Sequence, residues 1–305
     1  MNSISDSASE PSPNQLIFSS EETDRLLKQV ETDLANENFD SSDSQLIQQM
    51  VECLGDSRGL TRLGFAEALG AVGKPAVPFL LEALAHHSNV VVKRAAAKTL
   101  TLIADPVSIP VLLNSFLHDE DQVVRNSCIG ALAVMGEAVV PSLINILSGD
   151  RGDETIKGHA AWALAFIGVK AKEQIYQAFD SSSADLRSAI VGAVAKIAEE
   201  EPEERALELL VKSLKDSSAD VRSEAAAALG LLRYKPAIPL LIKLIDNSET
   251  ESRKSAALAL MKIKDVSALD ALYSALNKES ESSVKQVIQL AINQIEQQAQ
   301  VEDWD

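Results

Sequence analysis

A basic residue recurs about every 32 residues through most of this 305-residue chain. The matching positions are Arg62, Lys93, Arg125, Lys157, Arg187, Arg222, Arg253 and Lys285. Successive positions are 31, 32, 32, 30, 35, 31 and 32 residues apart. Self-similarity at a nearly fixed period of this size is the sequence signature of a repeat protein, in which each repeat is one supersecondary unit. The sequence therefore predicts an array of small stacked units.

Each repeat has the pattern of an antiparallel helix pair. Mostly small or apolar side chains stand three and six residues after each basic residue, and Leu, Val or Ile follows at the seventh position. These offsets lie on one face of a helix. A second apolar segment precedes each basic residue, as in "PAVPFLLEAL" at 75–84 and "PAIPLLIKLI" at 236–245. Proline at the start of such a helix removes no hydrogen bond.

The predicted fold is all-α, a right-handed α-solenoid of about eight helix pairs over residues 43–298. Only 4% of the residues are aromatic, so Ala, Leu, Ile and Val must build the core. We expect residues 1–19, rich in Ser and Pro, to be a disordered tail, and residues 20–42 to form a capping helix and linker. Residues 299–305 form an acidic tail bearing Trp304, which is either a frayed end or a short docking peptide.

An aspartate often stands six residues before the repeated basic residue. The pairs are Asp56 with Arg62, Asp119 with Arg125, and Asp216 with Arg222. An aspartate in a turn can cap the next helix and also bridge to the arginine of its own or of an adjacent repeat. We interpret the pairs as a structural ladder that fixes the stacking of the repeats.

The net charge of −17 excludes some classes of partner. Binding to nucleic acid and to anionic membrane surfaces depends on clustered Lys and Arg, whereas residues 1–50 carry ten acidic and two basic side chains. The longest apolar runs are too short to span a bilayer, and the N-terminus lacks the basic and apolar blocks of a secretory signal. We therefore expect a cytoplasmic protein whose partner is another protein or a small molecule.

Motifs of catalysis and metal binding are missing from the sequence. There is no glycine-rich phosphate loop, HExxH, CxxC or nucleophile elbow. His86 and His118 occupy equivalent turns of neighbouring repeats, but Asp119 is the only obvious further ligand, so no metal site is predicted. No catalytic residue is predicted, and whether the protein is an enzyme stays open.

The second helices of a solenoid line its concave face, where partners usually bind. Five residues after each basic residue stand Glu67, Lys98, Gly130, Trp162, Gly192, Ala227, Leu258 and Leu290. Trp162 thus has a glycine at the matching position on either side. The indole either fills the gap between these glycines or is an exposed aromatic anchor for a flat ligand or a partner side chain.

In the second interpretation, a basic rim of Arg94, Lys98 and Lys196 would select an anionic ligand or an acidic peptide. The candidate binding residues are Trp162, Phe166, His159, Asn126, Gly130, Val134, Gly192, Lys196, Arg94 and Lys98.

The repeat pattern, with "VRSEAAAALG" at 221–230, resembles the HEAT family of helical solenoids and its subgroup named after cyanobacterial phycobilisome lyases. The stretch "KGHAAWALAFIG" at 157–168 resembles the aromatic "YYAAWWLG" of E/F-type phycobilin lyases, which handle open-chain tetrapyrroles. Trp162 matches the first tryptophan and His159 the second tyrosine, whereas Gly158 and Ala163 replace the other two aromatic residues.

The resemblance implies a binding and chaperoning module for a phycobiliprotein, its bilin chromophore, or both. It implies no permanent cofactor, only a bilin held transiently, and any enzymatic activity would be bilin lyase-like. The alternative is a non-enzymatic scaffold, because related HEAT proteins include a factor of phycobilisome breakdown and one that binds an iron–sulfur scaffold protein. Such a scaffold would serve iron–sulfur assembly or the maintenance of the photosystem or phycobilisome.

Overall fold

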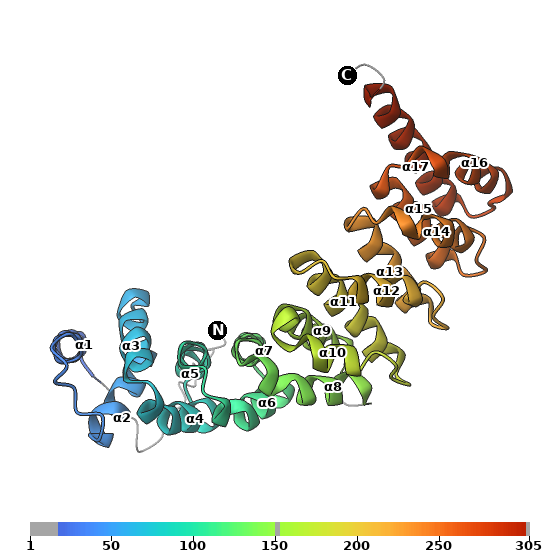
Figure 1. The fold of residues 1–305 in the computed structure, drawn as a ribbon. Coiled ribbons are helices and arrows are strands. Elements are labelled where there is room, and N and C mark those ends of the chain that lie inside the picture. The colour runs from blue at the N-terminus through green and yellow to red at the C-terminus, as the bar shows by residue number, and fades with distance from the viewer. Residues whose placement is uncertain (1–17, 150–152, 303–305) are drawn as a thin grey trace, which may run out of the picture. The chain divides into compact units, whose positions relative to one another are not determined.

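The computed structural model describes residues 18–149 and 153–302, and the chain divides into two compact units at Met135 and Gly136. The first 17 residues of the predicted tail and residues 303–305, with Trp304, lie outside the described part. Figure 1 shows that the described chain is built from helices, and it contains no strand. The prediction of an all-α solenoid is confirmed.

The N-terminal unit, up to Met135, contains a leading helix and three helix pairs. The helices are α1 (Ser20–Ala35), α2 (Ser44–Glu52), α3 (Gly59–Val72), α4 (Val77–His86), α5 (Val90–Ile103), α6 (Ile109–His118) and α7 (Gln122–Val134). Helix α1 begins at a capping box, in which Ser19 Oγ accepts from the Glu22 amide at 3.3 Å and the Ser19 amide donates to Glu22 Oε2 at 2.8 Å. Helix α1 packs on α3, and α3 packs in turn on α5.

The C-terminal unit, from Gly136, contains five helix pairs. The helices are α8 (Val140–Ser148), α9 (Glu154–Ile167), α10 (Lys172–Gln177), α11 (Ala184–Glu200), α12 (Glu204–Ser213), α13 (Ala219–Leu231), α14 (Ile238–Ile245), α15 (Thr250–Ile263), α16 (Leu269–Lys278) and α17 (Ser282–Glu302). Each second helix packs on the second helix of the next repeat, from α9 through α11, α13 and α15 to α17.

The repeat read from the sequence coincides with the helix boundaries. Each of the eight basic residues is the fourth residue of a second helix, from Arg62 in α3 to Lys285 in α17. Every side chain seven residues further on has an exposed fraction of 0%: Leu69, Leu100, Leu132, Leu164, Val194, Leu229, Leu260 and Ile292. The predicted apolar stripe is therefore the core of each repeat.

Several second helices begin at a side-chain cap four residues before the basic residue. Asn89, Asp121, Asp153 and Ser183 each accept a hydrogen bond from a backbone amide in the first turn of α5, α7, α9 and α11, respectively. A side-chain oxygen at this position satisfies an amide that has no partner inside the helix. The repeat thus includes its own signal for starting the second helix.

No single helix of the described chain is long and apolar enough to cross a membrane. Only α3 and the segment Lys74–His86 reach that length and composition together, and they are bent by 113° at their junction.

Candidate binding grooves

Helix α9 presents two aromatic side chains one turn apart. The rings of Trp162 and Phe166 have centroids 5.5 Å apart and planes tilted by 30°. Their side chains are 50% and 54% exposed, whereas the core aromatic residues Phe65 and Phe116 are buried. Half of the indole therefore faces solvent, and Trp162 is not a buried plug between two glycines.

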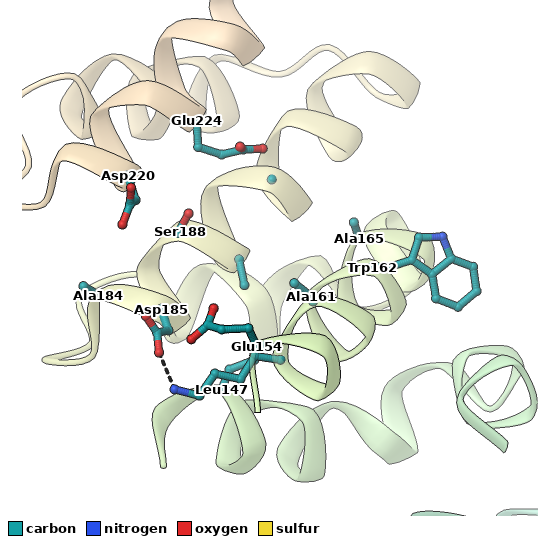
Figure 2. Close-up of a pocket in the computed structure, with 14 residues that line it drawn as sticks. Leu147, Glu154, Ala161, Trp162, Ala165, Ala184, Asp185, Ser188, Asp220 and Glu224 are labelled. Carbon is teal, nitrogen blue, oxygen red and sulfur yellow. Dashed lines mark hydrogen bonds and ion pairs between the residues drawn. The ribbon is translucent and has the colours of Figure 1, made fainter. Parts of the chain in front are cut away.

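Trp162 borders a groove of about 510 Å³, which we call the acidic groove (Figure 2). Helices α9 and α11 form its walls, and α13 contributes Asp220 and Glu224. Gly192 of α11 lines the groove, and a Cβ atom at this position would lie 3.2 Å from Glu224 Oε1. Gly158 also lines it, and a Cβ there would meet no atom within 4 Å. Glycines on α9 and α11 therefore keep this groove open, while the indole of Trp162 points away from Asp220 and Glu224 (Figure 2).

Carboxylates dominate the acidic groove. Glu154, Asp185, Asp220 and Glu224 line it, and the one basic side chain in its lining, Lys157, lies 2.5 Å from Asp185 Oδ2. Solvent reaches Glu224, but the groove walls remove part of its water and this burial raises the pKa of its carboxyl group. The groove thus favours cationic groups and hydrogen-bond donors over anions.

None of the three side chains of the predicted basic rim lines the acidic groove. Lys196 does not line the acidic groove, and its ammonium group lies 2.7 Å from Glu199 and 3.8 Å from Glu200. These glutamates stand three and four residues after Lys196 on the same helix face and neutralise its charge. Arg94 and Lys98 belong to the N-terminal unit, where they line a different groove.

That second groove has a volume of about 770 Å³ and lies mainly between α3 and α5; we call it the basic groove. Arg62, Arg94 and Lys98 line it together with Leu63 and Leu102. The side chains of Leu63 and Leu102 are 52% and 59% exposed. The basic groove thus combines cationic groups with apolar walls open to solvent.

The cations of the basic groove differ in how far their charge is neutralised. Arg94 donates from Nε and Nη2 to the carboxylate of Asp121 at 2.9 and 2.5 Å. Arg62 donates from Nη1 to the backbone oxygen of Asp56 at 2.5 Å, a neutral acceptor. Lys98 is exposed and has no ion pair within the described residues. Lys98 and Arg62 therefore keep positive charge available to a ligand.

The remaining candidate residues do not line either groove. In the N-terminal unit, Asn126 accepts a hydrogen bond from Gln122 at 3.0 Å, and Val134 is exposed. Gly130 has open space at its Cβ position. His159 of the C-terminal unit is half-buried. The sequence interpretation missed Leu63 and Leu102. Leu63 stands one residue after the basic residue of its repeat, and Leu102 stands nine residues after that of the next repeat. Both positions point away from the core.

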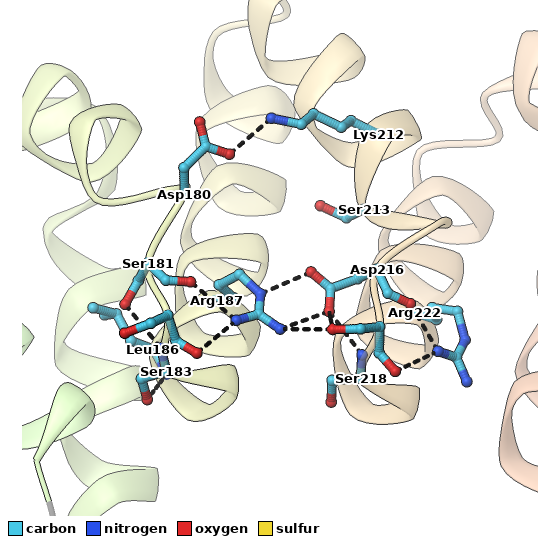
Figure 3. A network of polar contacts seen from close by, with 12 residues as sticks. Asp180, Ser181, Ser183, Leu186, Arg187, Lys212, Ser213, Asp216, Ser218 and Arg222 are labelled. Carbon is cyan, nitrogen blue, oxygen red and sulfur yellow. Dashed lines mark hydrogen bonds and ion pairs between the residues drawn. The ribbon is translucent and has the colours of Figure 1, made fainter.

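Ion pairs between one repeat and the next link successive repeats, as Arg187 and Asp216 do in Figure 3. Arg187 donates from Nε and Nη2 to the carboxylate of Asp216, both at 2.8 Å, and from Nη1 to the backbone oxygen of Ser181 at 3.0 Å. Arg253 likewise donates from Nε to the carboxylate of Glu279 and from Nη1 to the backbone oxygen of Asn247. In the N-terminal unit, Lys93 binds Asp119.

These contacts decide between the two predicted partners of Asp216: its carboxylate pairs with the arginine of the adjacent repeat and not with Arg222 of its own repeat. Of Asp216, Arg222 binds the backbone oxygen, at 2.7 Å, and it also donates to Ser252 Oγ at 3.1 Å. The Asp216 carboxylate binds Arg187 of the preceding repeat. Arg125 and Arg62 likewise bind backbone oxygens of Asp119 and Asp56. Each aspartate also accepts the amide two residues later, which fixes its carboxylate away from its own repeat's arginine. The Asp56 carboxylate binds Arg58.

We expect Arg187→Ala to lower the free energy of unfolding by about 1–3 kcal/mol, because it removes a charged, partly buried pair. Arg187 holds the pKa of Asp216 below its ordinary value, so this pKa should rise in Arg187→Ala. Arg222→Ala is the matched control, since it removes contacts to backbone oxygens and to Ser252 Oγ but leaves the Asp216 carboxylate paired with Arg187, so the Asp216 pKa should stay low. NMR titration of Asp216 distinguishes the two variants. If the Asp216 pKa rose only in Arg222→Ala, the Asp216 carboxylate would be paired with the arginine of its own repeat.

Comparisons with known proteins agree with this architecture. A model of HEAT repeats matches residues 40–133, 140–229 and 207–293. The bilin biosynthesis protein MpeU of Synechococcus sp. (strain WH8020) is 36% identical over 276 residues, which cover 90% of this chain and 93% of MpeU.

A solved structure shares the fold. Karyopherin Kap121p, bound to the extreme C-terminus of the protein phosphatase Cdc14p, has a TM-score of 0.55 at 12% identity over 92% of this chain and 38% of its own. The complex of CpcE and CpcF of phycocyanin lyase from Nostoc sp. PCC7120 has a TM-score of 0.44 at 24% identity over 50% of this chain and 98% of that chain. The repeat model and the sequence relative together show that this chain belongs to the phycobilisome lyase-like family of HEAT-repeat proteins.

Proposed function

We propose that this protein is a binding and chaperoning module that handles a phycobiliprotein and its bilin chromophore. The observation that carries the proposal is the half-exposed pair of Trp162 and Phe166 on α9, of which Trp162 borders the acidic groove. Exposed aromatic side chains next to an open groove are the usual anchors of a binding surface. The name of the relative MpeU, a bilin biosynthesis protein, supports the same class of cargo.

The grooves suit binding more than chemistry. Their ionisable side chains are carboxylates, lysines and arginines, and no group of three His, Cys, Asp or Glu side chains within residues 18–149 and 153–302 could hold a metal ion. We assign no catalytic residue. A chaperone of this kind would hold the bilin transiently and present it to, or receive it from, the protein that carries it.

The test is the colour of the purified protein. The full chain should be produced with and without a co-produced bilin, and its visible spectrum recorded after gel filtration. We expect a bilin absorption band that elutes with the protein only in the first preparation. Identical, colourless spectra would contradict the handling of a bilin.

A protein scaffold without a tetrapyrrole is the second candidate. Four carboxylates around the groove at Trp162 would complement a basic segment of a protein partner. Iron–sulfur assembly and maintenance of the photosystem or phycobilisome are examples of such a role. A protein that stays colourless with bilin, yet binds a protein partner through Trp162, would favour this candidate.

A further inference from the structure

We infer that the basic groove of the N-terminal unit, and not the groove at Trp162, takes the open-chain tetrapyrrole by its two carboxylates. The inference rests on the proposed function, since it assigns a site to the bilin within it. An open-chain tetrapyrrole is a flat, largely apolar molecule with two propionate groups, so its site needs both cationic donors and apolar walls.

The two grooves differ in the charge of their linings. Three cationic side chains line the basic groove, namely Arg62, Arg94 and Lys98, against one carboxylate, Asp56. The Asp56 carboxylate is bound by Arg58 Nε and Nη2 at 3.0 and 2.8 Å. The acidic groove has four carboxylates and one lysine, which is itself paired with Asp185. A dianion is therefore attracted to the first groove and repelled by the second.

The positions of the cations fit two carboxylates. Arg94 and Lys98 are four residues apart on α5, so they are neighbours on one helix face, about 5–6 Å apart at their Cβ atoms. The propionates of an open-chain tetrapyrrole stand on its two central rings and point to the same edge. Asp121 holds Arg94 through Nε and Nη2, which fixes the guanidinium in place before a ligand arrives. The charge that is not already paired comes from Lys98 and from Arg62 of α3.

The walls of the basic groove fit the rings. Leu63 of α3 and Leu102 of α5 are both more than half exposed, and Val123 of α7 adds a third apolar side chain. A flat ring system that covers these side chains would remove their apolar surface from water. The groove volume of about 770 Å³ lies within the range of about 300–1,000 Å³ that small-molecule sites occupy.

The experiment titrates the full chain with biliverdin and with biliverdin dimethyl ester, in which both carboxylates are masked. Binding is followed by the visible absorption of the pigment. We expect biliverdin to bind at least tenfold more tightly than the ester. Lys98→Glu should weaken biliverdin binding at least tenfold and leave the affinity for the ester nearly unchanged. Lys98 is exposed and unpaired within the described part of the chain, so this variant should fold, which its melting curve checks.

A matched variant completes the design. Lys196→Glu also reverses a lysine on a second helix but outside both grooves, and should bind biliverdin like the unaltered chain. Trp162→Ala tests the acidic groove instead. If Lys98→Glu binds biliverdin normally, or the ester binds as tightly as the acid, the assignment is overturned while the proposed function stands. Loss of biliverdin in Trp162→Ala alone would place the pigment in the acidic groove. Failure of the unaltered chain to bind biliverdin would overturn both proposals.

Discussion

Trp162→Ala is expected to weaken the binding of a phycobiliprotein subunit by about 30-fold or more, the loss typical of an anchoring aromatic residue. The same change should lower the free energy of unfolding by less than about 1 kcal/mol, as surface substitutions usually do. The reason is geometric: half of the indole is exposed, so its removal leaves no closed cavity. Calorimetric titration with the subunit and urea denaturation measure the two effects.

The matched control for Trp162→Ala is Phe65→Ala. Phe65 has an exposed fraction of 0%, so truncation should leave a cavity and cost about 3–5 kcal/mol. If Trp162→Ala proved as destabilising as Phe65→Ala, the indole would be a packing residue, and the proposal of an aromatic anchor would be wrong.

Gly230→Leu is expected to destabilise the C-terminal unit by about 3 kcal/mol, at the upper end of overpacking effects. A Cβ atom at Gly230 would lie 2.8 Å from the Cα and 3.3 Å from the backbone oxygen of Ala259. Helices α13 and α15 pack directly on each other, and backbone atoms cannot move aside as a side chain can. The two helices must therefore separate. Urea denaturation of the full chain measures the loss.

Gly192→Leu is the control, because it introduces the same side chain into a neighbouring second helix. The near atom there is Glu224 Oε1, the end of a flexible side chain. Because Leu has a higher helix propensity than Gly, the change should raise the free energy of unfolding by up to about 1 kcal/mol. The new leucine should also fill the acidic groove and block the phycobiliprotein subunit. Equal destabilisation by Gly192→Leu and Gly230→Leu would show that the groove beside Trp162 is already filled.

The sequence by itself determined the repeat, the helix pairs and the core. The basic residue and the buried side chain seven positions later are set by the local geometry of one helix. The 3.6-residue period of the helix and the fixed repeat length carry this information along the chain. The residues that point away from the core, including Trp162, Leu63 and Leu102, could be read from the same period. The structure places the side-chain cap four positions before the basic residue, and not at the aspartate six positions before it.

Only the tertiary structure decided which charges remain available and which groove each candidate residue lines. Asp216 binds Arg187, 29 residues earlier, instead of Arg222, and Arg94 is held by Asp121, 27 residues later. Such pairs form across stacked repeats over distances of about 3 Å, which the spacing of residues along one helix does not encode. The single site with a basic rim predicted from sequence therefore became two grooves of opposite charge, because packing between repeats sets which side chains share a surface.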